Sequence, residues 1–324
     1  MLHESFRSKQ MQLIYSSMNI EETARSSSRQ FHVQMTNALE EMNGAYLHQS
    51  TLHFDKSPRQ QLEECIAAQK DSFNQVTASM RQILHKFFGG QKDKDLRQVV
   101  NEQHNAFAGL INHMSECIEA LEKEGSDGAS EYLPMLKMLP EIYMQQFENN
   151  TQKMLQRFEA DFPSSVNFNA AVRLRGKNKI DCKSLDEIAQ PPQVMQKIWA
   201  QVNSSGKTFS SFKTANEFLV GLFQATGEQL TTEAKILVLY NLLSLIGYQA
   251  DEKLGNDGKF RSAVSDHTHA VCGAYAHIFI THDIRMARKL FAIYEYLEIK
   301  TRVCLGKRDE QGQFTLLAGK DIFF

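Results

Sequence analysis

The sequence predicts an α/β protein with a large helical part. Short apolar runs of strand length stand near the two ends of the chain, at residues 11–15 and 278–280. Between them, apolar residues recur every three or four positions over long stretches, which is the period of an amphipathic helix. A length of 324 residues and a hydrophobic content of 42% are sufficient for one large domain or two ordinary ones.

Composition narrows the possible function classes. The net charge is −2 at pH 7, so any binding of nucleic acid has to come from a local basic surface. Five cysteines are widely scattered and no C-x-x-C pair occurs, which argues against a zinc ribbon or a disulfide framework and fits a reducing cytoplasm. There is no run of about 18 apolar residues, and the N-terminus lacks the apolar core of a signal peptide. We therefore expect a cytoplasmic protein without membrane spans.

The first predicted element is a short strand at residues 11–15, followed by a helix. The pair Ser16-Ser17 offers an N-cap, and the acids Glu21 and Glu22 fall in the first turn of that helix. Acids in a first turn complement the helix macrodipole, which is one interpretation of both residues. Apolar residues at spacings of three and four predict that the helix continues over residues 23–48.

Three long amphipathic helices are predicted in the middle of the chain, at residues 58–88, 93–123 and 130–162. The first begins at a Ser-Pro pair and stops at two glycines, and the last is ended by Pro163. Short polar turns between long helices predict a bundle or an elongated hairpin arm. Its apolar stripes form either an internal core or a surface for a partner protein or a second copy of the chain.

The most regular basic stretch lies in the irregular region after this arm. Arg173, Arg175, Lys177 and Lys179 alternate with other residues, so an extended strand would place all four charges on one face. That face is a candidate for contacts to nucleic-acid phosphates. A solvated edge strand, protected from aggregation by its charges, has the same pattern.

Further helices are predicted at residues 194–202, 212–225 and 232–247. The last of them is apolar nearly all round, which indicates a buried helix. A hairpin is predicted around residues 310–313, close to the C-terminus.

The stretch with the clearest functional pattern runs from Asp266 to Asp283. Small residues at helical spacing follow Asp266, so we expect this acid to open a helix that lies close against a sheet. The apolar run at 278–280 predicts a buried strand, and Thr281 and Asp283 follow its end. In open parallel sheets, functional groups gather at the carboxyl ends of the strands. Two acids at that edge suit a divalent metal ion.

The order of features in this stretch resembles the C-terminal half of PIN-domain nucleases. An acid precedes small residues, and an apolar strand, the pattern T-x-D and a basic helix follow. The match covers residues 235–305, and residues 11–30 resemble the element that carries the second acid of that family. The resemblance implies a parallel sheet flanked by helices. It also implies Mg²⁺ or Mn²⁺ as cofactor and single-stranded RNA as substrate.

The same resemblance implies the roles of individual residues. Asp266 matches the third acid and Asp283 the fourth, while Glu22 matches the second, with Glu21 as the alternative by a one-residue slip. These acids would hold the metal, and Thr281 would orient a carboxylate or a metal-bound water. Converging carboxylates repel one another, and a divalent cation relieves that repulsion. Helix capping is the alternative interpretation of Asp266 and Asp283.

The chain departs from the PIN pattern at its start. The first acid of the family lies on an earlier strand, but the residues before Met11 contain Glu4 as their single acid and no apolar run. Either a first strand precedes the residues given, or the site is built without that ligand. The second case favours a catalytically inactive domain.

Basic side chains near the two acids are candidates for contacts to RNA. His269 follows Asp266 by three residues, so it faces the same side of a helix and would touch phosphate or the acid. Arg285, Arg288 and Lys289 follow the last acid and would contact the RNA backbone. A surface histidine and a solvated helix face are the alternative interpretations.

These patterns lead to one prediction of organisation and two of function. We predict a split PIN-like domain at residues 1–45 and 230–324, with a helical insertion at residues 46–229. The predicted function is a divalent-metal-dependent endoribonuclease, a hydrolase of single-stranded RNA of the toxin or defence-effector kind. The alternative is a catalytically inactive PIN-like domain that serves as a binding module or scaffold through its long helices.

Overall fold

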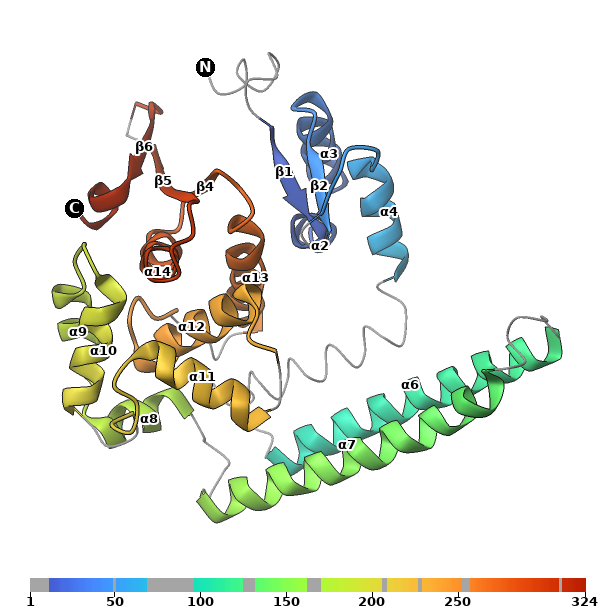
Figure 1. Ribbon diagram of the computed structural model, residues 1–324. Coiled ribbons are helices and arrows are strands. Elements are labelled where there is room, and N and C mark those ends of the chain that lie inside the picture. Colours follow the sequence, from blue (N-terminus) through green and yellow to red (C-terminus); the bar gives the residue numbers. More distant parts are fainter. Residues whose placement is uncertain are drawn as a thin grey trace. The chain divides into compact units, whose positions relative to one another are not determined.

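The computed structural model of the chain describes most of its residues, namely 12–48, 51–68, 96–124, 132–161, 170–205, 209–226, 229–251, 257–308 and 311–324. These residues form helices and two small sheets, so the chain is α/β, as predicted (Figure 1). None of the described helices combines the length and the hydropathy that crossing a membrane requires. The chain divides into two compact units, the larger made of Met1–Ile66, Ala170–Lys253 and Gly258–Phe324 and the smaller of Ala67–Asn169 and Leu254–Asp257.

The first sheet of the larger unit is formed by β1 (Ile14–Ser16), β2 (Ala45–His48) and β3 (Thr51–His53). β1 and β2 are parallel, and β2 and β3 are antiparallel. A strand is therefore present where residues 11–15 predicted one, but it covers Ile14–Ser16, and Gln12 and Leu13 lie outside it. β2 and β3 were not predicted, because each is too short to show a period of its own.

The two helices that connect β1 to β2 are α2 (Ser17–Ala24) and α3 (Arg29–Glu41). The predicted cap at Ser16 is confirmed, since its backbone N–H donates to the side-chain oxygen of Asn19 over 2.9 Å. The single helix predicted over residues 23–48 is wrong. A run of serines starts a second helix, in which Ser28 Oγ accepts a hydrogen bond from the Phe31 N–H.

The second sheet is formed by β4 (Ile278–Thr281), β5 (Arg302–Arg308) and β6 (Phe314–Ala318), and α14 (Ile284–Tyr296) connects β4 to β5. β4 and β5 are parallel, while β5 and β6 form the predicted antiparallel hairpin. The prediction of a single parallel sheet is wrong, because the described strands form two separate mixed sheets. A short turn can join only antiparallel neighbours, so each hairpin makes its sheet mixed.

β4 differs from the buried strand that its composition predicted. Ile278 and Ile280 are 42% and 38% exposed, whereas Phe279 packs against the core. Side chains alternate between the two faces of a strand, so the core covers only the face that carries Phe279. β4 is therefore a half-buried strand.

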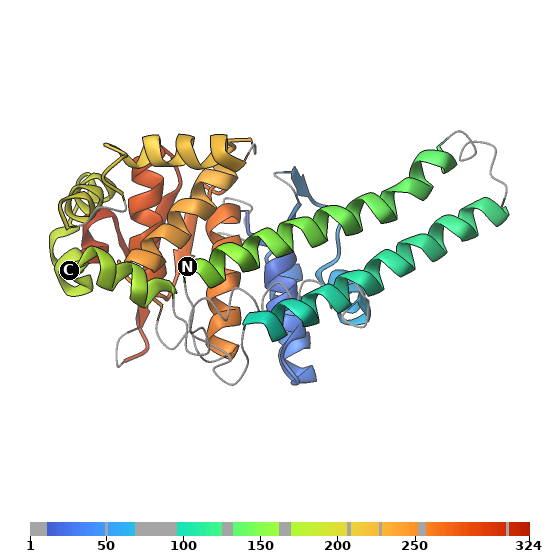
Figure 2. The ribbon, with the colours of Figure 1, turned by 90° about the horizontal axis from the view of Figure 1, so that it is seen from below.

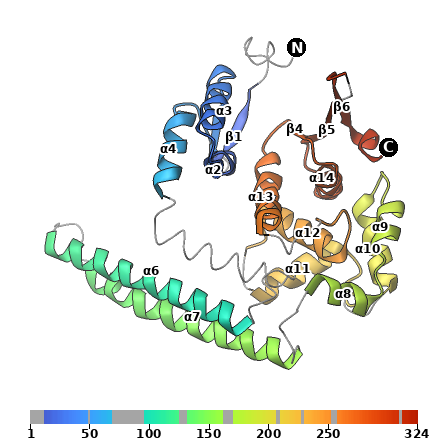
Figure 3. The same ribbon diagram turned by 180° about the vertical axis from the view of Figure 1, so that it is seen from behind.

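The helices that complete the larger unit are α4 (Pro58–Ala68), α8 (Ala170–Asn178), α9 (Cys182–Ile188), α10 (Val194–Ser205), α11 (Ala215–Thr226), α12 (Thr232–Ile246) and α13 (Asp257–Gly273). α12 and α14 pack against each other, and α10 contacts α14 as well (Figure 3). Trp199, Leu219, Ile236 and Ile293 are members of one buried cluster. The insertion predicted at residues 46–229 is therefore too long, because the last third of this range supplies side chains to the core of the larger unit.

The prediction of an extended strand for the basic stretch is wrong, because this stretch forms α8 and the turn after it. Alternate residues on a helix point about 200° apart, so the four charges do not share a face. Arg175 is partly buried and donates to the carbonyl oxygens of Leu245 over 2.9 Å and Ser244 over 3.4 Å. Arg173, Lys177 and Lys179 are exposed. The structure therefore has no continuous row of these four charges. Arg175 has a structural role, and the other three are cations at the surface.

The smaller unit contains two long helices, α6 (Leu96–Glu124) and α7 (Leu133–Asp161). They confirm the helices predicted at 93–123 and 130–162, whereas most of the helix predicted at 58–88 lies outside the described residues. α6 and α7 run in opposite directions (Figure 2), with the rings of Phe107 and Phe147 stacked at 4.3 Å. The predicted hairpin arm is therefore present.

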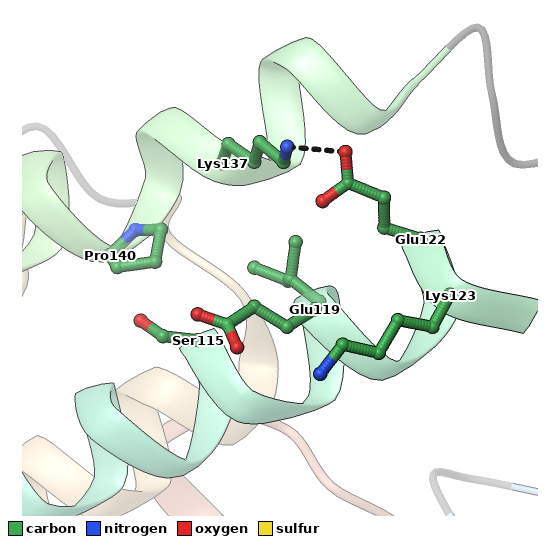
Figure 4. A pocket seen from close by; sticks show the side chains of 7 residues that line it. Ser115, Glu119, Glu122, Lys123, Lys137 and Pro140 are labelled. Carbon is green, nitrogen blue, oxygen red and sulfur yellow. Dashed lines mark hydrogen bonds and ion pairs between the residues drawn. The ribbon is translucent and has the colours of Figure 1, made fainter.

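Pro140 lies inside α7 and borders a hollow of about 390 Å³ between the two arm helices (Figure 4). Lys137 Nζ and Glu122 Oε1 form an ion pair over 2.7 Å beside it. The hollow is lined by residues of α6 and α7 and contains none of the predicted site residues. α7 continues through Pro140 without a break.

Replacing Pro140 with alanine is expected to stabilise the arm by about 1–3 kcal/mol. Proline lacks the N–H that would bond to the carbonyl of Leu136, and its ring crowds that carbonyl. Urea unfolding of the full chain, followed by far-ultraviolet circular dichroism, measures the gain. Glu141→Ala on the same helix serves as the control and is expected to change stability by less than about 0.5 kcal/mol. A Pro140→Ala variant no more stable than wild type would show that the proline ring contributes packing that alanine cannot replace.

Candidate functional site

A fully buried lysine lies at the centre of the polar cluster in the larger unit. Lys289, on α14, is 0% exposed, and its Nζ lies 3.0 and 3.1 Å from the two carboxylate oxygens of Asp251. Ser244 Oγ lies 3.3 Å from the same nitrogen, and the ring of Tyr240 lies 4.2 Å below it. The predicted contact of Lys289 with an RNA backbone is therefore wrong, because the ammonium is enclosed by protein groups.

Asp266 faces the same cluster from α13. The interpretation of Asp266 as a helix cap is wrong, because α13 begins at Asp257, well before it. Burial, together with the negative charges of Asp251 and Asp283, raises the pKa of Asp266 to about 7. Lys289 and His269 act in the opposite direction. Three carboxyl groups, which we call the acid cluster (Asp251, Asp266 and Asp283), thus interact with one another around one ammonium.

Asp283 occupies the turn between β4 and α14. Its Oδ1 accepts hydrogen bonds from the N–H groups of Arg285 over 2.7 Å and Met286 over 3.2 Å, so the predicted capping role is confirmed. The N–H of Asp283 donates to Thr281 Oγ1 over 3.1 Å, which fixes the turn. Thr281 therefore orients Asp283 through the backbone. The second carboxylate oxygen of Asp283 accepts no hydrogen bond from the described residues.

Glu22 reaches α13 through His269. Its carboxylate lies 3.2 Å from His269 Nε2, and this contact is the largest cause of the lowered pKa of Glu22. Arg25, on the turn after the same helix, donates to Ser265 Oγ over 3.1 Å. The acid that His269 contacts is Glu22, whereas the predicted contact was with phosphate or with Asp266. Glu22 is thus linked to Asp266 through a histidine and does not join the acid cluster directly, while Glu21 pairs with Arg25 over 3.8 Å.

Tyr240 and His267 are two ring-bearing side chains beside the acid cluster. Tyr240 is 0% exposed, and its hydroxyl has no hydrogen-bond partner among the described residues. The same hydroxyl interacts electrostatically with all three acids of the cluster. His267 packs edge-on against the Tyr240 ring at 4.9 Å, and burial lowers its pKa to about 4, so it is neutral. A buried hydroxyl that lacks a partner beside carboxylates suits a water molecule or a hydrated cation.

The basic residues after Asp283 contribute less to a binding surface than predicted. Arg288 donates to the carbonyl oxygens of Ile322 and Phe323, each over 3.2 Å, and its guanidinium lies 5.5 Å from the Phe323 ring. It therefore holds the C-terminal segment to α14. Arg285 is partly buried.

Asp251 is a site residue that the sequence did not predict, whereas Lys289 was predicted with a different role. One signal was available, because Lys289 falls on the same stripe of α14 as the buried residues Met286, Leu290 and Ile293. A lysine on a buried stripe needs a buried acid nearby, since an unpaired buried charge is strongly unfavourable. The sequence does not say which acid supplies it.

No group of three or more histidine, cysteine, aspartate or glutamate side chains among the described residues is arranged to hold a metal ion. The ammonium of Lys289 neutralises Asp251, and the raised pKa of Asp266 keeps that carboxyl partly protonated near neutral pH. The donor chemistry suits one hard divalent cation, which prefers oxygen ligands.

The fold and the cluster together define an α/β protein in which a buried lysine is paired with one member of a partly exposed group of acids. No protein-family model, curated protein or solved structure matches this chain.

Proposed function

We propose that this chain is a divalent-metal-dependent endoribonuclease with a PIN-like fold that hydrolyses phosphodiester bonds in single-stranded RNA. The observation that supports the proposal is the electrostatic interaction of Asp266, on α13, with Asp251 after α12 and with Asp283 before α14. Like charges held together in a partly buried site make the cation-free state unfavourable. A divalent cation removes that cost, which is the basis of metal binding in nucleases.

In this proposal, Asp266 and Asp283 are the residues that would hold Mg²⁺ or Mn²⁺. The bound ion supplies positive charge for a phosphoryl oxygen and lowers the pKa of a water molecule. Asp283 has one carboxylate oxygen fixed by the start of α14, which leaves the other oxygen in a defined position. The hydroxyl of Tyr240 is the protein group that would orient a water beside them. Glu22, held by His269, would act at the edge of the site.

Position on the fold supports the assignment as well. Asp283 follows the carboxyl end of β4, which is parallel to β5 and joined to it by α14. Groups at the carboxyl ends of parallel strands are the usual place of chemistry in α/β folds. The exposed cations Arg173, Lys177 and Lys179 remain candidates for contacts to RNA phosphates.

A specific observation favours a second function. Lys289 already neutralises Asp251, and a built-in ammonium takes over part of the role of a metal ion. This favours a catalytically inactive PIN-like domain that binds a partner through its helical arm. The two proposals differ in one measurable property, which is metal-dependent cleavage of RNA.

The test is a cleavage assay with a fluorescent single-stranded RNA, Mn²⁺ and the full chain. Asp283→Asn is expected to slow cleavage by at least about 100-fold, because a neutral amide keeps the helix cap but cannot hold the cation. Asp181→Asn is the matched control, since Asp181 caps α9 in the same way without belonging to the acid cluster. Equal cleavage by Asp283→Asn and wild type would remove Asp283 from the site. Absence of cleavage by wild type would favour the inactive binding module.

A further inference from the structure

We propose that one face of the second sheet binds single-stranded RNA by stacking on its bases and by contacting its phosphates. We call it the open face, and its exposed side chains are Ile278, Ile280, Arg302, Arg308, Phe314 and Leu316. The inference rests on the proposed function for the identity of its ligand. It adds to that function the surface that would hold the RNA.

Strand register brings the side chains of the open face together. Ile278 is paired with Arg302 across β4 and β5, and Phe314 is paired with Arg308 across β5 and β6. Paired residues of adjacent strands project on the same side of a sheet. α14 packs against the opposite side, whose side chains belong to the core (Figure 1). The large apolar side chains of the open face are between 36% and 42% exposed, so a ligand can reach them.

Two rings lie next to each other on the open face, beyond the end of β4. The rings of His282 and Phe314 meet edge to face, with their centroids 5.8 Å apart. His282 Nδ1 donates to the carbonyl oxygen of Gly306 over 2.9 Å, which fixes the imidazole over β5. Gly306 makes room for both rings, since a Cβ there would lie 2.9 Å from the Phe314 ring and 3.1 Å from the His282 ring. Phe314 keeps 36% of its surface exposed, which leaves part of its ring open to a base.

The charge of the open face selects the kind of ligand. Arg302 begins β5 and Arg308 ends it, and both side chains are exposed. Six residues of strand separate them by about 20 Å, so they would contact different phosphates of one chain. The three strands contain no aspartate or glutamate among their described residues. Exposed rings between positive charges form the kind of surface that binds unpaired nucleotides, whose bases are free to stack.

The open face borders the proposed cleavage site. His282 directly precedes Asp283, and both side chains are exposed. RNA held by the two rings would therefore have its neighbouring phosphates near Asp283. The open face would supply affinity, while the acids would supply the chemistry.

The stacking contact is tested with two substitutions of the same ring. Phe314→Leu keeps apolar cover over Gly306 but removes the aromatic face, so it is expected to weaken RNA binding about tenfold. Phe314→Tyr keeps the ring and is expected to bind within about twofold of wild type. Phe54→Leu is the matched control, because Phe54 is 68% exposed and follows β3 of the other sheet. It is expected to leave the affinity unchanged.

The phosphate contacts are tested through the dependence of affinity on salt. The double variant Arg302→Gln/Arg308→Gln is expected to reduce the slope of log affinity against log salt by about 1.4, because each phosphate contact to a single strand contributes about 0.7. Arg29→Gln/Arg59→Gln removes two other exposed arginines and is expected to keep the wild-type slope.

The experiment is fluorescence anisotropy of a labelled single-stranded RNA with the full chain in EDTA, which separates binding from metal-dependent cleavage. Duplex RNA of the same length is expected to bind at least about tenfold more weakly, since its bases are already stacked on one another. Thermal unfolding of each variant shows whether the fold is kept. If Phe314→Leu unfolds, the salt slope of the arginine variant carries the test.

The outcomes separate this inference from the proposed function. A wild-type chain that binds single-stranded RNA at the open face but does not cleave it with Mn²⁺ would overturn the nuclease function and support this inference. Cleavage by wild type, with unchanged RNA affinity in Phe314→Leu and an unchanged salt slope in the arginine variant, would overturn this inference alone. A wild-type chain without affinity for RNA would also overturn it and leave the open face to a protein partner.

Discussion

Asp266→Asn is expected to make the chain more stable at pH 8 and to leave its stability at pH 4 nearly unchanged. The pKa of Asp266 is about 7 in the folded chain, against 3.8 for an ordinary aspartate. Between these two values, the folded chain holds a proton that the unfolded chain has released, so stability falls as the pH rises toward 7. Asparagine resembles the protonated carboxyl and carries no such cost.

The size of the effect follows from the shift in pKa. One pKa unit corresponds to about 1.4 kcal/mol, so the variant is expected to gain up to about 4 kcal/mol above pH 7. Denaturant unfolding in EDTA at several pH values from 4 to 8 measures the difference between the two proteins. His267, whose pKa burial lowers to about 4, has the opposite effect on stability as the pH rises. It is present in both proteins, so its contribution cancels in the difference.

A matched control is Asp55→Asn, since the Asp55 side chain is 80% exposed. This variant is expected to show no gain that grows with pH. Added Mn²⁺ is expected to reduce the advantage of Asp266→Asn, because the cation stabilises the ionised carboxyl in wild type alone. If the difference between Asp266→Asn and wild type does not change between pH 4 and pH 8, Asp266 is not in the coupled environment described above.

Gly247→Ala is expected to destabilise the larger unit by about 3–5 kcal/mol. Gly247 ends α12 in the left-handed region, with a φ of 96°, where a side chain is strained. A Cβ at this position would lie 2.2 Å from Cys182 Sγ and 3.3 Å from Arg175 Cδ. The turn also leads from the helix that carries Ser244 to Asp251. The variant is therefore expected to disturb the pairing of Lys289 as well as the fold.

Urea unfolding measures this loss, with Gly176→Ala as the control. Gly176 lies in α8 with open space around it, so alanine there is expected to be neutral or to stabilise by up to about 1 kcal/mol. Adding Cys182→Ala to Gly247→Ala is expected to recover the part of the loss that comes from the sulfur contact. The strain of the left-handed backbone would remain. Wild-type stability in the single variant Gly247→Ala would mean that the helix end and Cys182 are not packed as described.

Local patterns predicted the elements that depend on neighbouring residues. Four such features depend on residues only a few positions apart in the sequence. They are the cap at Ser16, the strand β4, the capping role of Asp283 and the hairpin of β5 and β6. The start of α13 was misplaced, because Asp266 looks like a cap in the sequence while the helix has already begun at Asp257. A helix whose first turns carry few apolar residues gives a weak periodic signal.

The sequence by itself determined the class of the fold, most of the helices, and two of the three acids in the cluster. Only the tertiary structure decided that Asp251 is the third acid, that Lys289 is its partner, and that Glu22 meets His269 first. The physical reason is that a charge pattern in a helix is compatible with solvent or with a buried partner, and burial decides between them. Lys289 and Asp251 are 38 positions apart, so their pairing depends on how α12 packs against α14.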